Sequence, residues 1–150
     1  MKPMINVELE CANENCMPEY KTNGSSGVDL KANIDDDYIT IEPFERVLVP
    51  TGIKIALPAG YEAQVRPRSG MALKQGITVL NTPGTVDADY RGEVGAILIN
   101  LSNERVTIRK FDRIAQLVFQ KVEQAQFTVV QAICNDTDRG AGGFGHTGKN

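Results

Sequence analysis

Two arginines and a serine near the middle of the chain have the spacing of an anion-binding segment, Arg66-Pro-Arg68-Ser69-Gly70. Alternate residues of an extended backbone share one face, so both guanidinium groups can point at one ligand. Ser69 and Gly70 then open a helix whose free N–H groups favour an anion. The segment predicts a phosphate site, and the alternative is a pair of surface arginines beside an ordinary capping serine.

A second polar segment, from Asn81 to Gly92, carries two acids and a tyrosine between two expected strands. Asp87 and Asp89 share one face of an extended chain, so they could form a metal-binding pair or a general base with its neighbour. Tyr90 could be a half-buried rim residue or a flat platform beneath a sugar or a base. The alternative for the whole segment is a solvated loop.

The C-terminal residues form a third segment, in which residues 139–150 include five glycines, Arg139 and the aromatic Phe144. Glycine backbone can approach an anion closely, arginine binds phosphate as a fork, and an aromatic ring can cover a flat ring. The segment suits a phosphorylated, ring-containing ligand, although its composition also suits a disordered tail. Matches to the dinucleotide-binding and P-loop patterns are rejected, because those motifs need a helix after the glycines.

Two shorter segments complete the candidates. Asp29 follows a tight Gly-Ser-Ser-Gly turn and, taken alone, is typical of a turn residue. Asp112-Arg113-Ile-Ala-Gln116 leads from a polar turn into an apolar stretch, and taken alone it indicates a β-turn with a surface ion pair. Neither segment by itself distinguishes a site from a surface turn.

Short strands are the elements that must position these segments. Apolar residues recur with a period of two, and turn residues separate the stretches. We expect a short helix with Ser69 as its N-cap, good helix formers from Met71 to Gln75, and Gly76 as its C-cap. These elements predict an all-β sandwich or barrel forming a single domain of 150 residues. The expected strands lie around residues 5–9, 47–49, 53–57, 94–98, 106–108, 114–119 and 127–129.

Composition excludes several classes of protein. A net charge of −3 argues against a nucleic-acid binder that relies on a general positive field. The single histidine, His146, excludes a multi-histidine metal site and a Ser-His-Asp triad elsewhere in the chain. Cys11, Cys16 and Cys134 follow no zinc or C-x-x-C spacing. With no signal peptide and no apolar run that could span a bilayer, we expect a cytoplasmic protein.

Taken together and in this order, the segments resemble the five motifs of the trimeric dUTPases, the deoxyuridine triphosphate nucleotidohydrolases. The matching residues are 27–32, 66–72, 84–94, 112–119 and 139–148. Ser26 stands where the family often has alanine, and His146 where the last motif often has serine. The second departure leaves Thr147 as the hydroxyl for the terminal phosphate, with His146 as the alternative donor. A dCTP deaminase of the same fold would need an active-site glutamate where this chain has Asp87, and a nucleotide-sensing regulator without turnover is the other alternative.

The resemblance implies a jelly-roll-like β-barrel, the β-clip of dUTPases, with one short helix. It also implies a homotrimer in which residues 1–135 form the barrel and residues 136–150 form an arm that closes over a neighbour's active site. The implied reaction converts dUTP to dUMP and pyrophosphate by attack of water on the α-phosphate of the Mg²⁺-bound triphosphate. That activity would remove dUTP from the DNA precursor pool and supply dUMP, without nucleic-acid or membrane partners.

The resemblance also implies roles for individual residues. Asp87 would orient and deprotonate the attacking water, and Asp29 would touch Mg²⁺ through water, so no dedicated protein cage for the metal is expected. Tyr90 would pack under the deoxyribose and Phe144 would cover the uracil. The remaining substrate-binding residues would be Asn81, Gly84, Thr85 and Val86 at the base, Arg68, Ser69, Gly70 and Gln116 at the inner phosphates, and Arg139, Gly145 and Thr147 at the outer end. The role of Arg66 stays open.

Overall fold

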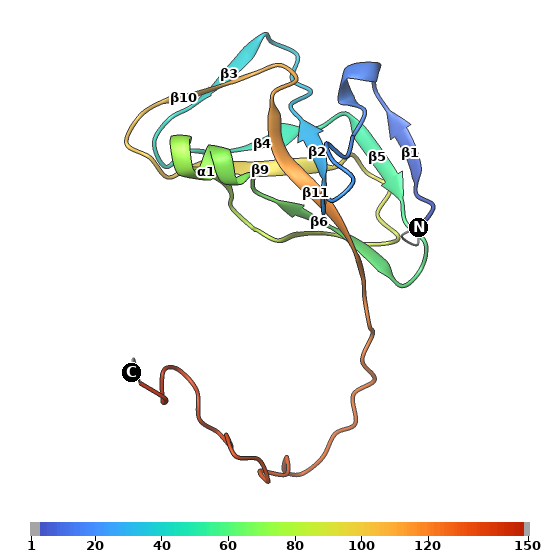
Figure 1. Ribbon diagram of the computed structural model, residues 1–150, viewed down its shortest axis with the longest axis vertical. Coiled ribbons are helices and arrows are strands. Elements are labelled where there is room, and N and C mark those ends of the chain that lie inside the picture. Colours follow the sequence, from blue (N-terminus) through green and yellow to red (C-terminus); the bar gives the residue numbers. More distant parts are fainter. Residues whose placement is uncertain (1–3, 149–150) are drawn as a thin grey trace.

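The computed structural model describes residues 4–148, which form mainly short β-strands (Figure 1). One α-helix, α1 (Ser69–Gln75), and one 3-10 helix, η1 (Glu14–Cys16), accompany them in this part of the chain. The strands are β1 (Glu8–Cys11), β2 (Val28–Lys31), β3 (Tyr38–Ile41), β4 (Arg46–Pro50), β5 (Ile53–Ala56), β6 (Tyr61–Arg66), β7 (Ile77–Val79), β8 (Gly84–Val86), β9 (Gly95–Asn100), β10 (Val106–Arg109) and β11 (Arg113–Lys121).

The strands pair into small antiparallel sheets that wrap around one core. The largest has the strand order β2-β11-β6-β8, and a second has the order β4-β9-β7. Two further ribbons, β1-β5 and β10-β3, lie at the ends of the body. Because β11 pairs with both β2 and β6, the last strand joins two strands from the first half of the chain. The prediction of an all-β barrel of the jelly-roll type is confirmed.

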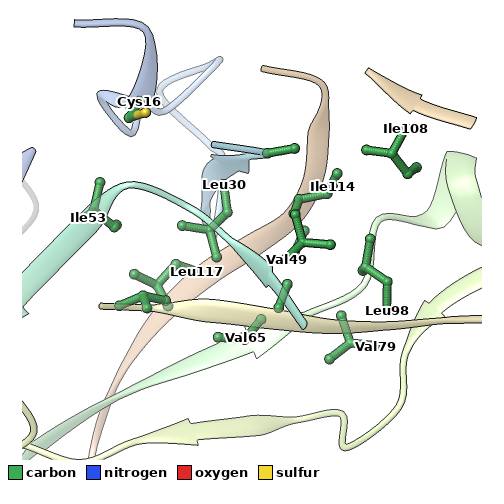
Figure 2. Close-up of a cluster of buried hydrophobic side chains, with 14 of the residues drawn as sticks. Cys16, Leu30, Val49, Ile53, Val65, Val79, Leu98, Ile108, Ile114 and Leu117 are labelled. Atoms are coloured by element: carbon green, nitrogen blue, oxygen red, sulfur yellow. The ribbon is translucent and has the colours of Figure 1, made fainter. Parts of the chain in front are cut away.

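The core follows directly from the period-two pattern of the sequence. In β9 the side chains alternate, so that Ala96 and Leu98 are buried while Ile97 and Ile99 are only partly covered. Figure 2 shows Leu30 of β2, Leu98 of β9, and Ile114 and Leu117 of β11 in the same buried cluster. Apolar burial of this kind is the main force that holds the sheets together.

The predicted helix is present, with one correction at its start. Ser69 is the first helical residue, and the N-cap is Arg68, which is extended and makes no side-chain cap hydrogen bond. The Arg68 side chain instead turns toward Asp29, while its carbonyl accepts the first helical bond from Ala72 at 3.1 Å. Gly76 is the C-cap as predicted, with a φ of 66° that favours glycine. Within residues 4–148 there is no helix long and apolar enough to cross a membrane.

The prediction of a strand at residues 127–129 is wrong. Residues 122–148, here called the C-terminal segment, contain no strand or helix and run away from the barrel (Figure 1). Phe127 and Val129 are 90% and 96% exposed. An alternating apolar pattern forms a strand only where a sheet edge pairs with it, and this segment meets none within its own chain. The arm expected from residue 136 is thus part of a longer segment that starts after β11, and its residues 149 and 150 lie outside the described chain.

Candidate functional site

The carboxylate of Asp29, on β2, lies between two guanidinium groups. Its Oδ1 is 3.6 Å from Arg68 Nε and its Oδ2 is 3.3 Å from Arg113 Nη1. Arg68 Nη1 also donates a hydrogen bond of 3.0 Å to the Arg113 carbonyl oxygen. Two positive groups around one carboxylate leave a net positive charge beside the start of α1. Arginine groups held in this way are suited to bind a phosphate.

Strand pairing brings Gln116 into the same group. On β11 this residue lies opposite Asp29 of β2 on one side and opposite Arg66 of β6 on the other. Its Nε2 donates a 2.9 Å hydrogen bond to the carbonyl of Pro67, which holds the turn between β6 and α1. Ser69 and Gly70 follow as the first two residues of α1, and both are exposed. The structure therefore gathers Asp29, the Arg68 turn and Gln116 at one end of the sheet, and we call Asp29, Arg68, Arg113 and Gln116 the arginine cluster.

Arg113 is the member of this cluster that sequence reasoning missed. The turn pattern indicated a surface ion pair with Asp112, but the Asp112 carboxylate accepts a 2.8 Å bond from the Arg109 amide, and Arg113 pairs with Asp29. The β11–β2 register shifts between Arg113 and Ala115. Such a bulge inserts an extra residue and re-aims a side chain, so Arg113 joins the face of Gln116, three positions on. No local pattern reveals a partner 84 residues away.

The Asn81 segment forms the connection from β7 to β8. Gly84 lies opposite Val65 of β6, and a Cβ on Gly84 would be 3.3 Å from both Val65 Cβ and Asn81 Nδ2. The glycine therefore allows the Asn81 side chain to lie across the strand start. Thr85 is exposed, and Val86 is buried.

Asp87 follows β8 and points into solvent. Its carbonyl accepts a 3.2 Å bond from the Tyr90 amide, which closes a tight turn. Within residues 4–148 the Asp87 carboxylate has no hydrogen-bond or ion-pair partner, so both of its oxygens are available to a water molecule. A carboxylate in this state can accept a proton.

The ring of Tyr90 is held by the backbone that follows it. Its hydroxyl donates a 3.0 Å hydrogen bond to the Glu93 carbonyl. A Cβ built on Gly92 would lie 2.6 Å from Tyr90 Cζ, so the ring rests directly against the Gly92 backbone. Because the residue is still 45% exposed, part of the ring remains available as a flat contact surface.

The single chain does not bring Asp87 to the arginine cluster. Val86 lies opposite Ala63, whereas Arg68 follows Arg66 at the other end of the β6–β8 ladder. With about 3.3 Å per residue along a strand, the stretch of β6 from Ala63 to Arg66 alone spans roughly 10 Å, and Asp87 and Arg68 lie beyond its opposite ends. Asn81 lies at the Gly84 end of this ladder. The candidate residues of the barrel therefore form two groups, which are the arginine cluster and the connecting segment from Asn81 to Tyr90.

The C-terminal segment contributes a third group that reaches neither of the other two (Figure 1). Arg139 Nε donates a 2.8 Å bond to the Gly142 carbonyl, and Phe144 is fully exposed. Val122 donates to the Gly60 carbonyl at 2.9 Å, and the described hydrogen bonds beyond it stay within the segment. The residues that line a hollow of the segment itself are Asp138, Arg139, Gly145, His146 and Thr147. This hollow lies apart from the arginine cluster, so we regard it as a bend of the segment and not as a complete site.

Comparison with known proteins gives a consistent assignment. A family model described as dUTPase matches residues 13–148. The deoxyuridine 5'-triphosphate nucleotidohydrolase of Fusobacterium nucleatum is 58% identical over 133 residues, covering 89% of this chain and 90% of that protein. The protein of the same name from Desulfotalea psychrophila is 60% identical over 132 residues, covering 88% and 87%.

A solved structure shares the fold. A variant of the Staphylococcus bacteriophage 80alpha dUTPase with dUpNHpp superposes with a TM-score of 0.83 at 23% identity, covering 95% of this chain and 98% of that one. The family match includes all five motif segments named above, from the strand that carries Asp29 to the glycine-rich end. The chain therefore belongs to the dUTPase family.

Proposed function

We propose that this chain hydrolyses dUTP to dUMP and pyrophosphate. The observation that carries the proposal is the presence, in a chain of this family, of the arginine cluster together with the unpaired carboxylate of Asp87. The relatives that share most of its length are named for hydrolysis of deoxyuridine triphosphate. The proposed role is removal of dUTP from the cytoplasmic pool of DNA precursors, which also yields dUMP.

The arginine cluster supports the assignment of the phosphate site. Arg68 is held at the sheet end by Asp29 and by the Arg113 carbonyl, and the exposed N–H groups of Ser69 and Gly70 follow it at once. Gln116 keeps this turn in place through Pro67. In our proposal Arg68, Ser69 and Gly70 bind the α- and β-phosphates, because a guanidinium fork and backbone donors match phosphate oxygens.

The β7–β8 connection supports the assignment of the nucleoside site. Asn81 and the backbone of residues 84–87 would read the edge of the uracil. Tyr90 would lie under the deoxyribose, and a ring held against Gly92 has little freedom to retreat from a 2′-hydroxyl group. The site would therefore select a deoxyribonucleotide.

Asp87 supplies the proton acceptor of the proposed reaction. As a water oxygen forms its bond to the α-phosphorus, the bond from that phosphorus to the bridging oxygen of the β-phosphate breaks and pyrophosphate leaves. Asp87 takes the proton that the water loses. Such general base catalysis contributes about 10²- to 10⁴-fold, so the rest of the acceleration must come from positioning and charge stabilisation by Arg68 and backbone N–H groups.

The residues present fit a magnesium ion that arrives with the substrate. Mg²⁺ bound to the three phosphates would neutralise charge that develops on the leaving group. Both oxygens of Asp29 already face guanidinium groups, which suits contact with such an ion through water more than direct ligation. Among the described residues no group of three or more His, Cys, Asp or Glu could hold a metal ion by itself.

The separation of the three groups supports a shared site in a homotrimer. Asp87 and Arg68 of one chain lie at opposite ends of the same ladder, so one chain cannot place both on one α-phosphate. In our proposal one copy supplies the arginine cluster, a second supplies Asn81 to Tyr90, and the C-terminal segment of a neighbour closes over them. Arg139, Gly145 and Thr147 would then reach the γ-phosphate, and Phe144 the uracil. A neighbouring copy would also cover the exposed Phe127, Val129 and Ile133 side chains.

The direct test is pyrophosphate release from the purified protein with Mg²⁺, comparing dUTP, dTTP, dCTP and UTP. Rapid release from dUTP alone is expected, together with a particle mass about three times 16.4 kDa by light scattering. Formation of a uracil base from dCTP would make the chain a deaminase. Tight dUTP binding without turnover would make it a sensor, and either result would overturn the proposal.

A further inference from the structure

We propose that Arg113 is a positioning residue that holds Asp29 in place and thereby frees Arg68 for the phosphates. This inference rests on the proposed function, since it takes the triphosphate as the ligand of Arg68. Arg113 belongs to none of the substrate or metal roles assigned above. Its position in the cluster gives it two separate contacts, one through its side chain and one through its backbone.

The contacts around Asp29 are divided between the two arginines. Arg113 Nη1 approaches Oδ2 at 3.3 Å, and Arg68 Nε approaches Oδ1 at 3.6 Å, so each oxygen has its own partner. The Arg113 carbonyl also accepts the 3.0 Å hydrogen bond from Arg68 Nη1. Arg113 is thus linked to both other charged members of the cluster.

Charge balance gives these contacts a consequence for binding. Asp29 is the most enclosed of the three side chains at 14% exposed, against 28% for Arg68 and 45% for Arg113. A carboxylate with so little solvent around it needs a cationic partner. If Arg68 were the only cationic partner of Asp29, the Asp29 carboxylate would compete with the phosphates for the Arg68 guanidinium group. With Arg113 in place, Arg68 can turn to the phosphates while Asp29 keeps a counter-charge.

The backbone explains why Arg113 can do this. The bulge between Arg113 and Ala115 brings Arg113 to the face that carries Gln116, and Gln116 lies directly opposite Asp29. Arg113 itself lies opposite Lys31, so its carbonyl is part of a paired strand. The acceptor offered to Arg68 is therefore fixed by the sheet and does not depend on the ligand.

The test compares Arg113→Gln with Arg105→Gln. Arg105 makes an ion pair of the same kind, 2.7 Å from Glu42, on an exposed surface outside the cluster, so it is a matched control. Pyrophosphate binding without Mg²⁺ is measured by calorimetry, after thermal unfolding shows that each variant is folded. We expect Arg113→Gln to weaken binding about tenfold, the range of one charge-assisted contact, and Arg105→Gln to leave it unchanged.

A second substitution separates positioning from a direct phosphate contact. With Asp29→Asn in the Arg113→Gln background, no carboxylate competes for Arg68, so pyrophosphate binding should recover most of the loss. If Arg113→Gln fails to fold, Arg113→Lys keeps the charge and is expected to weaken binding less than tenfold.

Three outcomes would overturn the inference: unchanged binding in Arg113→Gln, a loss that Asp29→Asn does not relieve, or no pyrophosphate binding by the unaltered protein. Pyrophosphate binding that is intact in a protein unable to hydrolyse dUTP would count against the proposed function alone.

Discussion

The arginine cluster and the C-terminal segment both carry arginine aimed at phosphate in our proposal, yet they are built in opposite ways. The cluster is fixed by cross-strand pairing of β11 with β2 and β6 and by contacts of 2.9 to 3.6 Å. Beyond Val122 the segment is held by its own local hydrogen bonds. The fixed part can present charge in a constant geometry, and the free part can move to admit and enclose a ligand.

The difference also has an energetic meaning. Ordering a backbone residue costs about 1–2 kcal/mol, so a closed segment of this length needs contacts from outside itself. The described chain offers the segment none beyond Val122, and the glycines leave it without a core. Ligand and neighbouring copies are the available sources of those contacts. Changes in the barrel and in the segment should therefore have separable effects on stability and turnover.

The largest effect is expected from Asp87→Asn, which tests whether Asp87, a residue of the barrel, is the proton acceptor. The substitution keeps the shape of the side chain and removes the acceptor, so kcat should fall about 10³-fold with little change in substrate binding. Asp89→Asn, in the same turn, should retain most turnover. Steady-state kinetics with dUTP measures both, and a kcat for Asp87→Asn near that of the parent would remove Asp87 from its role.

Truncation after Asp138 tests the segment directly. Loss of Arg139, Phe144 and Thr147 should lower kcat/KM for dUTP at least about 100-fold, because the outer phosphate and the base lose their cover. The melting temperature should stay the same, since these residues make no described contact with the barrel. A truncated protein with normal kcat/KM would show that the segment has no part in catalysis.

Asn100→Ala tests the opposite case, a barrel residue with no proposed catalytic role. The side chain is fully buried and donates to the Ile41 and Glu104 carbonyls at 2.9 and 2.7 Å while its oxygen accepts from Ser102. Leaving these groups unpaired should lower the free energy of unfolding by about 3 kcal/mol. Urea denaturation at constant protein concentration measures the change, with exposed Asn103→Ala as the control. Equal stability of the two variants would contradict the account of the core.

Gly92→Ala tests how rigidly the barrel holds Tyr90. The added methyl group would overlap the ring, which must then shift away from its place. The ratio of kcat/KM for dUTP to that for UTP should fall about tenfold, close to the effect of one poorly placed contact. Gly24→Ala, where a Cβ would meet nothing within 4 Å, is the matched control. An unchanged ratio would mean that Tyr90 does not select the sugar.

The smallest effect is expected from the cysteines at alkaline pH. Burial raises the pKa of the Cys16 thiol above its ordinary value of 9.0, and Cys11 nearby adds to the shift. The unfolded chain therefore loses this proton first, so the stabilising effect is complete below pH 9 and declines as the pH rises above it. The loss is at most about 1.4 kcal/mol per pH unit. Urea titrations from pH 8 to 10 should show a shallower decline for Cys16→Ala than for the exposed Cys134→Ala.

Local patterns in the sequence predicted much of the fold. Alternation of apolar residues identified the strands around Val49, Ala96 and Leu117, and Gly76 marked the end of the helix. The same alternation at Phe127 and Val129 was misleading, because alternating apolar residues form a strand only where the edge of a sheet is available for pairing. The helix starts at Ser69, one residue earlier than the capping-serine pattern predicted, and its N-cap residue Arg68 makes no side-chain cap hydrogen bond.

The sequence by itself determined the order and chemistry of the five motif segments, since residue types, turn residues and spacing are local properties. Only the tertiary structure decided which charged groups meet. Asp29 acquired Arg113 as a partner through a bulge and a strand pairing that join residues 84 positions apart. The same pairing rules put Asp87 and Arg68 at opposite ends of one ladder. Strand register depends on the packing of the whole core, so contacts between distant residues cannot be read from the segments that supply them.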